Sequence, residues 1–269
     1  AAAVGITGAA VTVVDEDAID LGAATVSGTY SVTAGGAITD SGTQEITGVT
    51  TLAAGSGNDI TLDTSTNNFA AAVGITSGRN VAITDEDAID LGAATVSGTY
   101  GITAGGAVTD SGTQEIAGAT TISASGQDVT LDISTNNFAA AVGITGAAVT
   151  VVDENTIDLG ASTVSGTYTI TATEGDITDS GNLAITNAAT FTTTEASSNI
   201  ILDQSGNAFS KKVTMKSGNG TAAFGNLTFV NSGPVRLHTS ADTDDDLYIN
   251  AATDGTVGGT LSVTANGDI

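Results

Sequence analysis

Apolar and polar residues alternate along most of the chain in runs of only three to five residues. Examples are Tyr30-Ser31-Val32-Thr33 and Ala37-Ile38-Thr39, and Gly-Gly, Ser-Gly or Asn-Asn pairs separate such runs. A period of two within a short run bounded by turn residues is typical of a β-strand. No stretch of useful length carries apolar residues at the 3.6-residue spacing of an amphipathic helix. The pattern therefore predicts an all-β chain with almost no helix.

Long segments of the sequence recur at an interval of about 70 residues, which indicates a repeat architecture. DEDAIDLGAATVSGTY begins at Asp15 and again at Asp85, and the related DENTIDLGASTVSGTY begins at Asp153. Between residues 15–46 and 85–116, 29 of 32 positions are identical, and two of the three differences exchange Val and Ile in opposite directions. A packed interior tolerates small volume changes of opposite sign. These segments are expected to be copies of one structural module.

A finer repeat lies within each module. An Asp follows a β-branched apolar run about every 23.5 residues, at Asp15, Asp40, Asp63, Asp85, Asp110, Asp132, Asp153, Asp179 and Asp203. A unit of about 22–25 residues cannot bury its apolar face alone, whereas stacked copies bury it in a continuous core. We therefore predict a parallel β-helix (β-solenoid) of about eleven coils, with about three coils in each module. The alternation places these residues inside: Val32, Ile38, Ile46, Leu52, Ile60, Phe69, Val73, Ile75 and Val81.

The repeat weakens towards the C-terminus. We expect regular modules over residues 1–204 and, continuous with them, a diverged module over residues 205–269 with about one extra coil. This diverged part is an older module or a lateral contact or recognition patch. It holds four of the five basic residues, the single Pro, the single His and an acidic run: Lys211, Lys212, Lys216, Arg236, Pro234, His238, Asp242, Asp244, Asp245 and Asp246.

The charge balance narrows the choice of partners. Five Lys and Arg residues face 30 Asp and Glu residues, which gives a net charge of −25, so we expect no nucleic acid held by a basic patch. The absence of Cys and the single His exclude disulfides and Cys/His zinc sites. No apolar stretch approaches the roughly 20 residues of a membrane-spanning helix. A Cys-free acidic chain suits an extracellular location, and because the sequence starts and ends within a repeat, we expect it to be part of a longer protein.

The Asp residues that recur along the chain are the main candidates for chemistry. Stacked carboxylates about 5 Å apart would repel by about 1 kcal/mol each in water, so another interaction must offset this repulsion. One hypothesis is that each carboxylate closes a turn by accepting a nearby backbone N–H. The other is a stripe of Ca²⁺ sites, for which the candidate ligands are Asp15, Asp17, Asp85, Asp87 and Asp153. Against calcium, Asn155 stands where the other modules have Asp17 and Asp87, and the GGxGxD motif of calcium-binding β-rolls is missing. No other cofactor and no catalytic residue is predicted.

Aromatic residues recur once per module rather than once per coil. Three coils would separate the copies by about 14 Å, which is too far for ring pairing. We therefore expect these residues to fill the interior and not to form a ligand platform: Tyr30, Tyr100, Tyr168, Phe69, Phe138 and Phe209.

Three sequence features carry a family resemblance. They are TVSGTYSVTAGGAITDSG over residues 25–42, NNFAAAVGIT over residues 67–76, and the turns GNDITLD and GQDVTLD over residues 57–63 and 126–132. Together they resemble the long repetitive regions of bacterial filamentous-haemagglutinin-like exoproteins and related giant surface adhesins. The resemblance extends to about Ser205. It implies a right-handed β-helical shaft of a secreted or surface-anchored protein.

The repeat pattern favours some classes of function over others. A structural or adhesive shaft explains near-identical modules that add length and multivalent contact to a host or neighbouring-cell surface or a glycan. A filament or sheath of like shafts side by side is the runner-up. A polysaccharide-active enzyme is not expected, because long loops, Trp and most basic residues are missing. An ice-binding face would need Thr-x-Thr at every coil, and the sequence offers it only at places such as Thr169-Ile170-Thr171.

Overall fold

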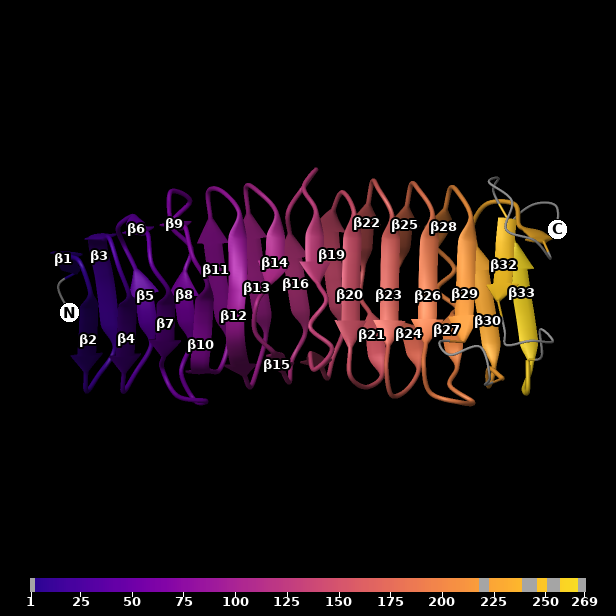
Figure 1. Ribbon diagram of the computed structural model, residues 1–269, viewed down its shortest axis with the longest axis horizontal. Coiled ribbons are helices and arrows are strands. Elements are labelled where there is room, and N and C mark those ends of the chain that lie inside the picture. The colour runs from indigo at the N-terminus through magenta and orange to yellow at the C-terminus, as the bar shows by residue number, and fades with distance from the viewer. Residues whose placement is uncertain (1–2, 218–222, 239–245, 251–256, 266–269) are drawn as a thin grey trace. The chain divides into compact units, whose positions relative to one another are not determined.

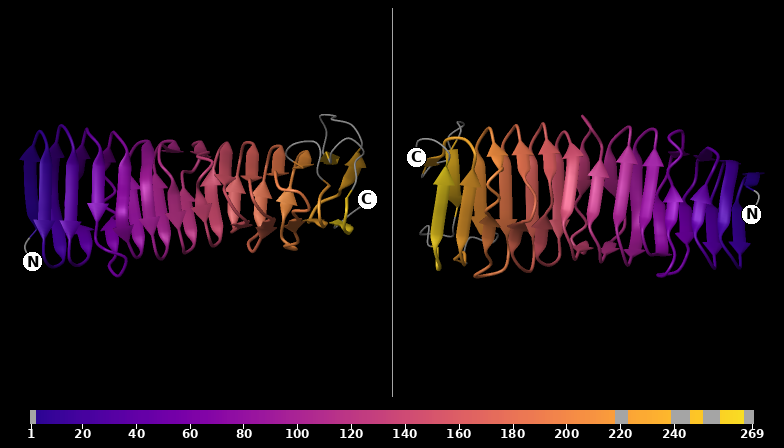
Figure 2. Two further views of the ribbon diagram at one scale, coloured as in Figure 1. Left: turned by 60° about the horizontal axis from the view of Figure 1, so that its bottom comes forward. Right: turned by 180° about the vertical axis from the view of Figure 1, so that it is seen from behind.

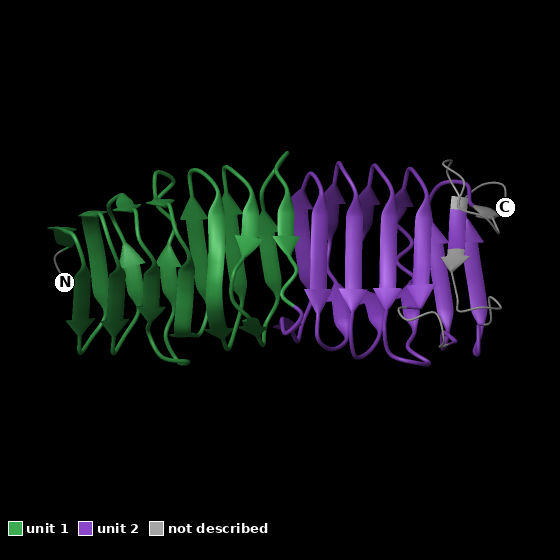
Figure 3. Ribbon diagram, viewed as in Figure 1, with its two compact units in different colours: residues 1–133 green, residues 134–269 purple. Residues whose placement is uncertain are grey.

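The structure, a computed structural model, describes residues 3–217, 223–238, 246–250 and 257–265. All regular elements in these ranges are β-strands, numbered β1 to β33 (Figure 1), so the described part of the chain is all-β as predicted. Within the same ranges, no helix of a length and hydrophobicity suited to crossing a membrane is found. The chain divides into two compact units, residues 1–133 and residues 134–269 (Figure 3).

Unit 1 consists of two facing sheets, here called sheet A and sheet B. Sheet A contains β1 (Val4–Gly8), β3 (Ile19–Val26), β5 (Ile38–Asp40), β6 (Gln44–Ile46), β8 (Ile60–Leu62), β9 (Asn68–Phe69), β11 (Val81–Asp85), β13 (Tyr100–Ala104) and β16 (Thr120–Ser123). Sheet B contains β2 (Val11–Asp15), β4 (Tyr30–Ala34), β7 (Thr50–Ala53), β10 (Val73–Gly78), β12 (Ile89–Val96), β14 (Val108–Asp110), β15 (Gln114–Ile116) and β17 (Val129–Leu131).

Unit 2 has the same construction. After β18 (Asn137–Phe138), one sheet contains β19 (Val142–Gly146), β21 (Ile157–Leu159), β22 (Ser162–Val164), β24 (Ile177–Asp179), β25 (Leu183–Ile185), β27 (Ile200–Leu202), β28 (Ala208–Phe209), β30 (Leu227–Asn231) and β33 (Leu261–Ala265). The facing sheet contains β20 (Val149–Asp153), β23 (Tyr168–Ala172), β26 (Ala189–Thr193), β29 (Val213–Ser217), β31 (Arg236–His238) and β32 (Asp246–Asn250).

Neighbouring strands in both units are parallel, and each pair joins one coil to the next. In unit 1, Val4 lies beside Leu21 and Glu45 lies beside Asn68. In each unit the near strands, such as β4 and β23, run downward while the chain advances to the right (Figure 1), and the far strands run upward when seen from behind (Figure 2). Both units are therefore right-handed parallel β-solenoids, as expected.

Most coils are shorter than the Asp spacing predicts. Val11 of β2 pairs with Tyr30 of β4, and in the same way Ile19 of β3 pairs with Ile38 of β5. Asp15 lies in sheet B, whereas Asp40 lies in sheet A. The two Asp residues thus occupy different sheets, and their separation measures more than one coil. The expected coil length was wrong because the Asp positions do not form one column.

Each module holds three and a half coils, not three. Strand β4 of the first module lies in sheet B, whereas its copy β13 lies in sheet A. Likewise, β3 lies in sheet A and its copy β12 in sheet B. Each module contains seven strands, when two short consecutive strands of one sheet such as β5 and β6 are counted as one, and these lie alternately in the two sheets. Because seven is odd, the second module presents its residues within unit 1 on the face opposite to the first. The prediction of about eleven coils for the chain is confirmed.

The interior is a narrow apolar core made by the alternation of each strand. All nine residues expected inside are buried, with at most 2% of their surface exposed. The recurring Tyr and Phe residues are also buried, which confirms them as core residues. In unit 2 they meet other aromatic residues: the ring of Phe191 lies 5.9 Å from that of Tyr168 and 6.0 Å from that of Phe209, in edge-to-face arrangement.

The diverged C-terminal part keeps the parallel pairing of the regular modules. Val213 of β29 lies beside Leu247 of β32, and Leu227 of β30 lies beside Leu261 of β33. These partners are farther apart in the sequence than the partners in the regular modules. The division into residues 1–204 and 205–269 reflects sequence divergence and stays a prediction.

Candidate functional site

Two of the predicted Asp candidates are buried acceptors at the corners between strands. Asp85 ends β11, and its Oδ1 accepts the N–H of Asp87 at 2.8 Å while Oδ2 accepts the N–H of Phe69 at 2.8 Å. Asp153 ends β20 and accepts the N–H groups of Asn155 and Phe138 in the same way, at 2.7 and 2.8 Å. Each carboxylate thus holds its own turn and also ties the preceding coil to it.

The loop of the first module shares the local bond but is less buried. Asp15 at the end of β2 accepts the N–H of Asp17 at 2.9 Å and is partly exposed. Asp85 and Asp153, in contrast, are 1% and 0% exposed. Burial raises the pKa of Asp85 above its ordinary value, against the opposing effect of the two N–H donors.

A second set of Asp residues, at Asp40 and its copies, bonds to the next coil. Oδ1 of Asp40 accepts the N–H of Asp63 at 3.0 Å, and Oδ2 accepts the side-chain amide of Asn67 at 2.6 Å. Asn67 in turn accepts the N–H of Gln44 at 2.9 Å. The same arrangement recurs at Asp179, Asp203, Asn207 and Leu183. The prediction of a donor close in sequence is therefore right for Asp85 and wrong for Asp40, because the donors to Asp40 lie in the adjacent coil.

Sequence reasoning missed the Asn of this corner. Asn67, Asn136 and Asn207 recur at the module spacing, two residues before each Phe, and all three are fully buried. A buried Asn must be hydrogen-bonded, so its recurrence beside the Asp repeat was the available signal.

The five calcium candidates do not converge on a common centre. Among the described residues, no group of three or more Asp, Glu, His or Cys side chains has the arrangement of a metal site. Both oxygens of Asp85 and of Asp153 already accept backbone N–H groups. Calcium at Asp15, Asp17 and Asp87 stays a prediction.

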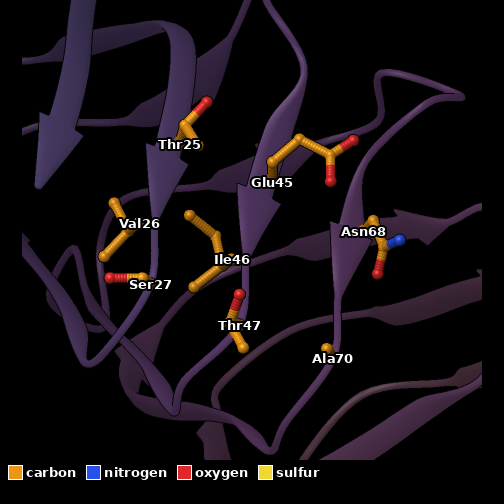
Figure 4. A pocket seen from close by; sticks show the side chains of 8 residues that line it. All are labelled: Thr25, Val26, Ser27, Glu45, Ile46, Thr47, Asn68 and Ala70. Atoms are coloured by element: carbon orange, nitrogen blue, oxygen red, sulfur yellow. The ribbon is translucent and has the colours of Figure 1, made fainter. Parts of the chain in front are cut away.

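A shallow hollow of about 190 Å³ opens on the outer side of sheet A (Figure 4). Thr25, Glu45 and Asn68 lie side by side across it, one from each of β3, β6 and β9. Buried Val26 and Ile46 lie next to them in the same strands. Glu45 is the single titratable group among the eight residues that line the hollow. The arrangement offers hydrogen bonds to a ligand but no nucleophile paired with a base.

The outer faces of unit 1 carry two recurring groups of residues, an uncharged patch and a column with one carboxylate. The uncharged patch of the first module lies on sheet B and consists of Thr12, Val14, Ser31, Thr33, Thr51 and Ala53. Its copy lies on sheet A and consists of Ala82, Thr84, Gly101, Thr103, Thr121 and Ser123. A column with one carboxylate, Asp20 beside Thr39 and Thr61, lies on sheet A, and its copy Asp90, Thr109 and Thr130 lies on sheet B. Because each module holds three and a half coils, both faces of unit 1 carry both groups of residues.

The basic cluster of the C-terminal part is only partly described. The ammonium group of Lys212 lies 5.2 Å from the centre of the Tyr248 ring. Arg236 and His238 lie in β31, and Asp246 begins β32. The side chains of these three residues, and all of Asp242, Asp244 and Asp245, lie outside the described part of the structure, so the predicted contact patch stays a prediction.

Comparison with known proteins gives one match. A family model described as "Repeats of unknown function (DUF5649)" matches residues 8–76, 78–145 and 146–216. Each match contains one of the three repeat copies that begin at Asp15, Asp85 and Asp153. No curated protein and no solved structure matches the chain.

Proposed function

The chain belongs to the family of repeats of unknown function (DUF5649), and from this premise we propose that it is a shaft segment of a large secreted or cell-surface bacterial protein. In this role the modules supply length and multivalent, adhesive contact to a host or neighbouring-cell surface. The resemblance to filamentous-haemagglutinin-like exoproteins supports the extracellular setting, as does the acidic, Cys-free composition.

The observation that carries this proposal is the repetition of outward residues on both faces of unit 1. The pairs Thr33 and Thr103, and Asp20 and Asp90, are copies that face opposite ways. A partner surface that approaches either face of unit 1 therefore meets the same side chains. Linked weak contacts of this kind raise avidity without any single strong site. The hollow at Glu45 supports the same view, because its lining suits a weak polar contact better than catalysis.

Surface display is tested by labelling intact cells that produce the full-length protein. An antibody against the exposed turn at residues 55–58 should label cells without permeabilisation, and brief protease treatment of the cells should remove the label. An antibody against a cytoplasmic protein serves as the control for cell integrity. Labelling that requires permeabilisation would contradict the proposal.

A second candidate is a subunit of a self-associating filament or sheath. The uncharged patches favour it, because Thr33 and Thr103 lie where two acidic chains could approach without direct charge repulsion. Sedimentation of the purified chain in rising NaCl separates the two candidates. A filament subunit should form larger species as salt screens the net charge of −25, whereas a shaft segment should stay monomeric throughout.

A further inference from the structure

Three polar atoms in the interior of the first module have no hydrogen-bond partner among the described residues. They are the hydroxyl of Tyr30, Oε1 of Gln44 and Oγ1 of Thr50. The three residues are at most 1% exposed. Buried polar groups of native proteins are nearly always hydrogen-bonded, to protein or to ordered water. Three such atoms in one module therefore call for a common explanation.

Strand pairing places two of these residues side by side in one sheet and the third in the facing sheet. Tyr30 begins β4 in sheet B, and Thr50 lies directly beside it in β7. Gln44 begins β6 in sheet A, in the same coil as Tyr30. Because facing sheets pack about 10 Å apart, an inward Tyr side chain from sheet B reaches most of the way to sheet A.

The second module indicates where the Tyr side chain points. Burial raises the pKa of Tyr100 above its ordinary range, and the charge of Asp110 adds to this rise. Asp110 precedes Gln114 by four residues at the corner between β14 and β15. This effect is consistent with a Tyr100 side chain that points across the core towards the facing sheet, which holds Asp110 and Gln114.

The third module changes this corner in a coordinated way. Tyr168 is kept, but the residues at the positions of Ala24, Gln44 and Thr50 are Ser162, Leu183 and Ala189. In the first module, Nε2 of Gln44 donates to the carbonyl of Gly22 at 2.8 Å.

Ser162 takes over part of this task in the third module. Its hydroxyl donates to the carbonyl of Gly160, the copy of Gly22, at 3.0 Å. It also lies beside the hydroxyl of Tyr168 and opposes the rise that burial causes in the pKa of Tyr168. In the first and in the third module alike, a polar side chain lies at this corner, Gln44 in one and Ser162 in the other.

We propose that Tyr30, Gln44 and Thr50 enclose one ordered internal water molecule. The water accepts a hydrogen bond from the Tyr hydroxyl and donates to Oε1 of Gln44 and Oγ1 of Thr50. Three partners are the usual number for a buried water. In the third module, Ser162 lies beside the hydroxyl of Tyr168, but the two are not hydrogen-bonded to each other. The apolar Leu183 and Ala189 give a water fewer partners there than the usual three.

A high-resolution crystal structure of the whole chain tests the site directly. We expect a water within about 3.2 Å of the Tyr30 hydroxyl and of Oε1 of Gln44, and none beside Tyr168. A direct hydrogen bond between Tyr30 and Gln44, or a corner without a water, would overturn the proposal.

Two variants test the exchange between modules. Gln44→Leu should remove the water and leave the Gly22 carbonyl unpaired, which should raise the unfolded-to-folded ratio at least about tenfold. The double variant Ala24→Ser with Gln44→Leu should recover most of this loss while the water stays absent. If the added Ser recovers nothing, or if Gln44→Leu retains the water, the proposed exchange is wrong.

Discussion

The carboxylate of Asp85 accepts the backbone N–H of Phe69, 16 residues earlier in the chain, at 2.8 Å. The other carboxylate oxygen accepts the N–H of Asp87. One buried side chain thus fixes its own turn and the end of β9 in the preceding coil. This link explains why an Asp recurs at a position where burial alone would disfavour it.

Replacement of Asp85 should therefore destabilise the fold. Asp85→Asn keeps the size but turns one acceptor into a donor, so one of the two buried N–H groups loses its partner. The expected cost is about 1–3 kcal/mol, measured as a lower midpoint of chemical denaturation. Asp87→Asn is the matched control, because Asp87 is exposed and contributes its backbone N–H, and it should change stability by less than about 0.5 kcal/mol. Equal effects of both variants would contradict this role.

Acidification should stabilise the fold between neutral pH and pH 4.5. Burial raises the pKa of Asp85 and of Asp179, so the folded chain binds more protons than the unfolded chain above their ordinary pKa. Stability contributed by this linkage rises as the pH falls. The Arg79 guanidinium, in contrast, holds the pKa of Asp59 at about 2, and its opposite contribution enters only at lower pH.

The melting temperature measured across this pH range checks the linkage. It should rise as pH falls from 7 to 4.5, and the rise should be smaller in a variant that carries both Asp85→Asn and Asp179→Asn. High salt in all samples limits the contribution of general charge repulsion. A melting temperature that falls over this range would contradict the assigned direction.

Coils approach so closely at the turns of Gly42, Gly112 and Gly181 that a Cβ would clash with the backbone of the neighbouring coil. A Cβ on Gly112 would lie 2.2 Å from the backbone nitrogen of Ala93, whereas a Cβ on Gly57 would meet nothing within 4 Å. Gly112→Ala should therefore cost about 1–3 kcal/mol through overpacking, and Gly57→Ala should be nearly neutral. Hydrogen exchange of the backbone amides around Ala93 would locate the effect. Full protection at Ala93 in the Gly112→Ala protein would contradict the close approach.

Calcium should not stabilise the chain specifically. The oxygens of Asp85 and Asp153 are occupied by backbone N–H groups, which leaves few free ligands for a cation that takes six to eight oxygens. We expect the same melting temperature in Ca²⁺ and in Mg²⁺ at equal concentration. A rise of several degrees with Ca²⁺ alone would show binding to the native state and would support a calcium site at Asp15, Asp17 and Asp87.

The fold could be predicted from the sequence because alternation and repetition are strong signals. Leu52 and Ile60, for example, are inward by alternation alone, and both are fully buried. The coil length could not be predicted, because Asp15 and Asp40 follow similar apolar runs although they end strands of different sheets. Only strand pairing separates two corners that share one residue type.

The role of the Asp residues as hydrogen-bond acceptors could be predicted from the sequence, but their donors could not. Asp is a good acceptor for a turn N–H, and this holds for Asp85 and Asp87. Whether a carboxylate bonds to its own turn or to the next coil depends on how coils stack, as at Asp40 and Asp63. The buried Asn67 was overlooked because Asn-Asn is an ordinary turn signal. That Asn67 also accepts the N–H of Gln44 depends on the stacking of the coils.

The most direct test of the account measures distances between spin labels in unit 1. The chain lacks Cys, so pairs of Cys can be introduced at exposed or partly exposed Thr51, Thr109 and Thr121. Thr51 and Thr109 lie on the same sheet three coils apart, about 14 Å along the axis. Thr121, the copy of Thr51, lies on the facing sheet three and a half coils away, about 17 Å along the axis and a further 10 Å across. Modules of three and a half coils should give a clearly longer distance for Thr51–Thr121 than for Thr51–Thr109. Equal short distances would show modules of three whole coils on one face and would contradict this prediction.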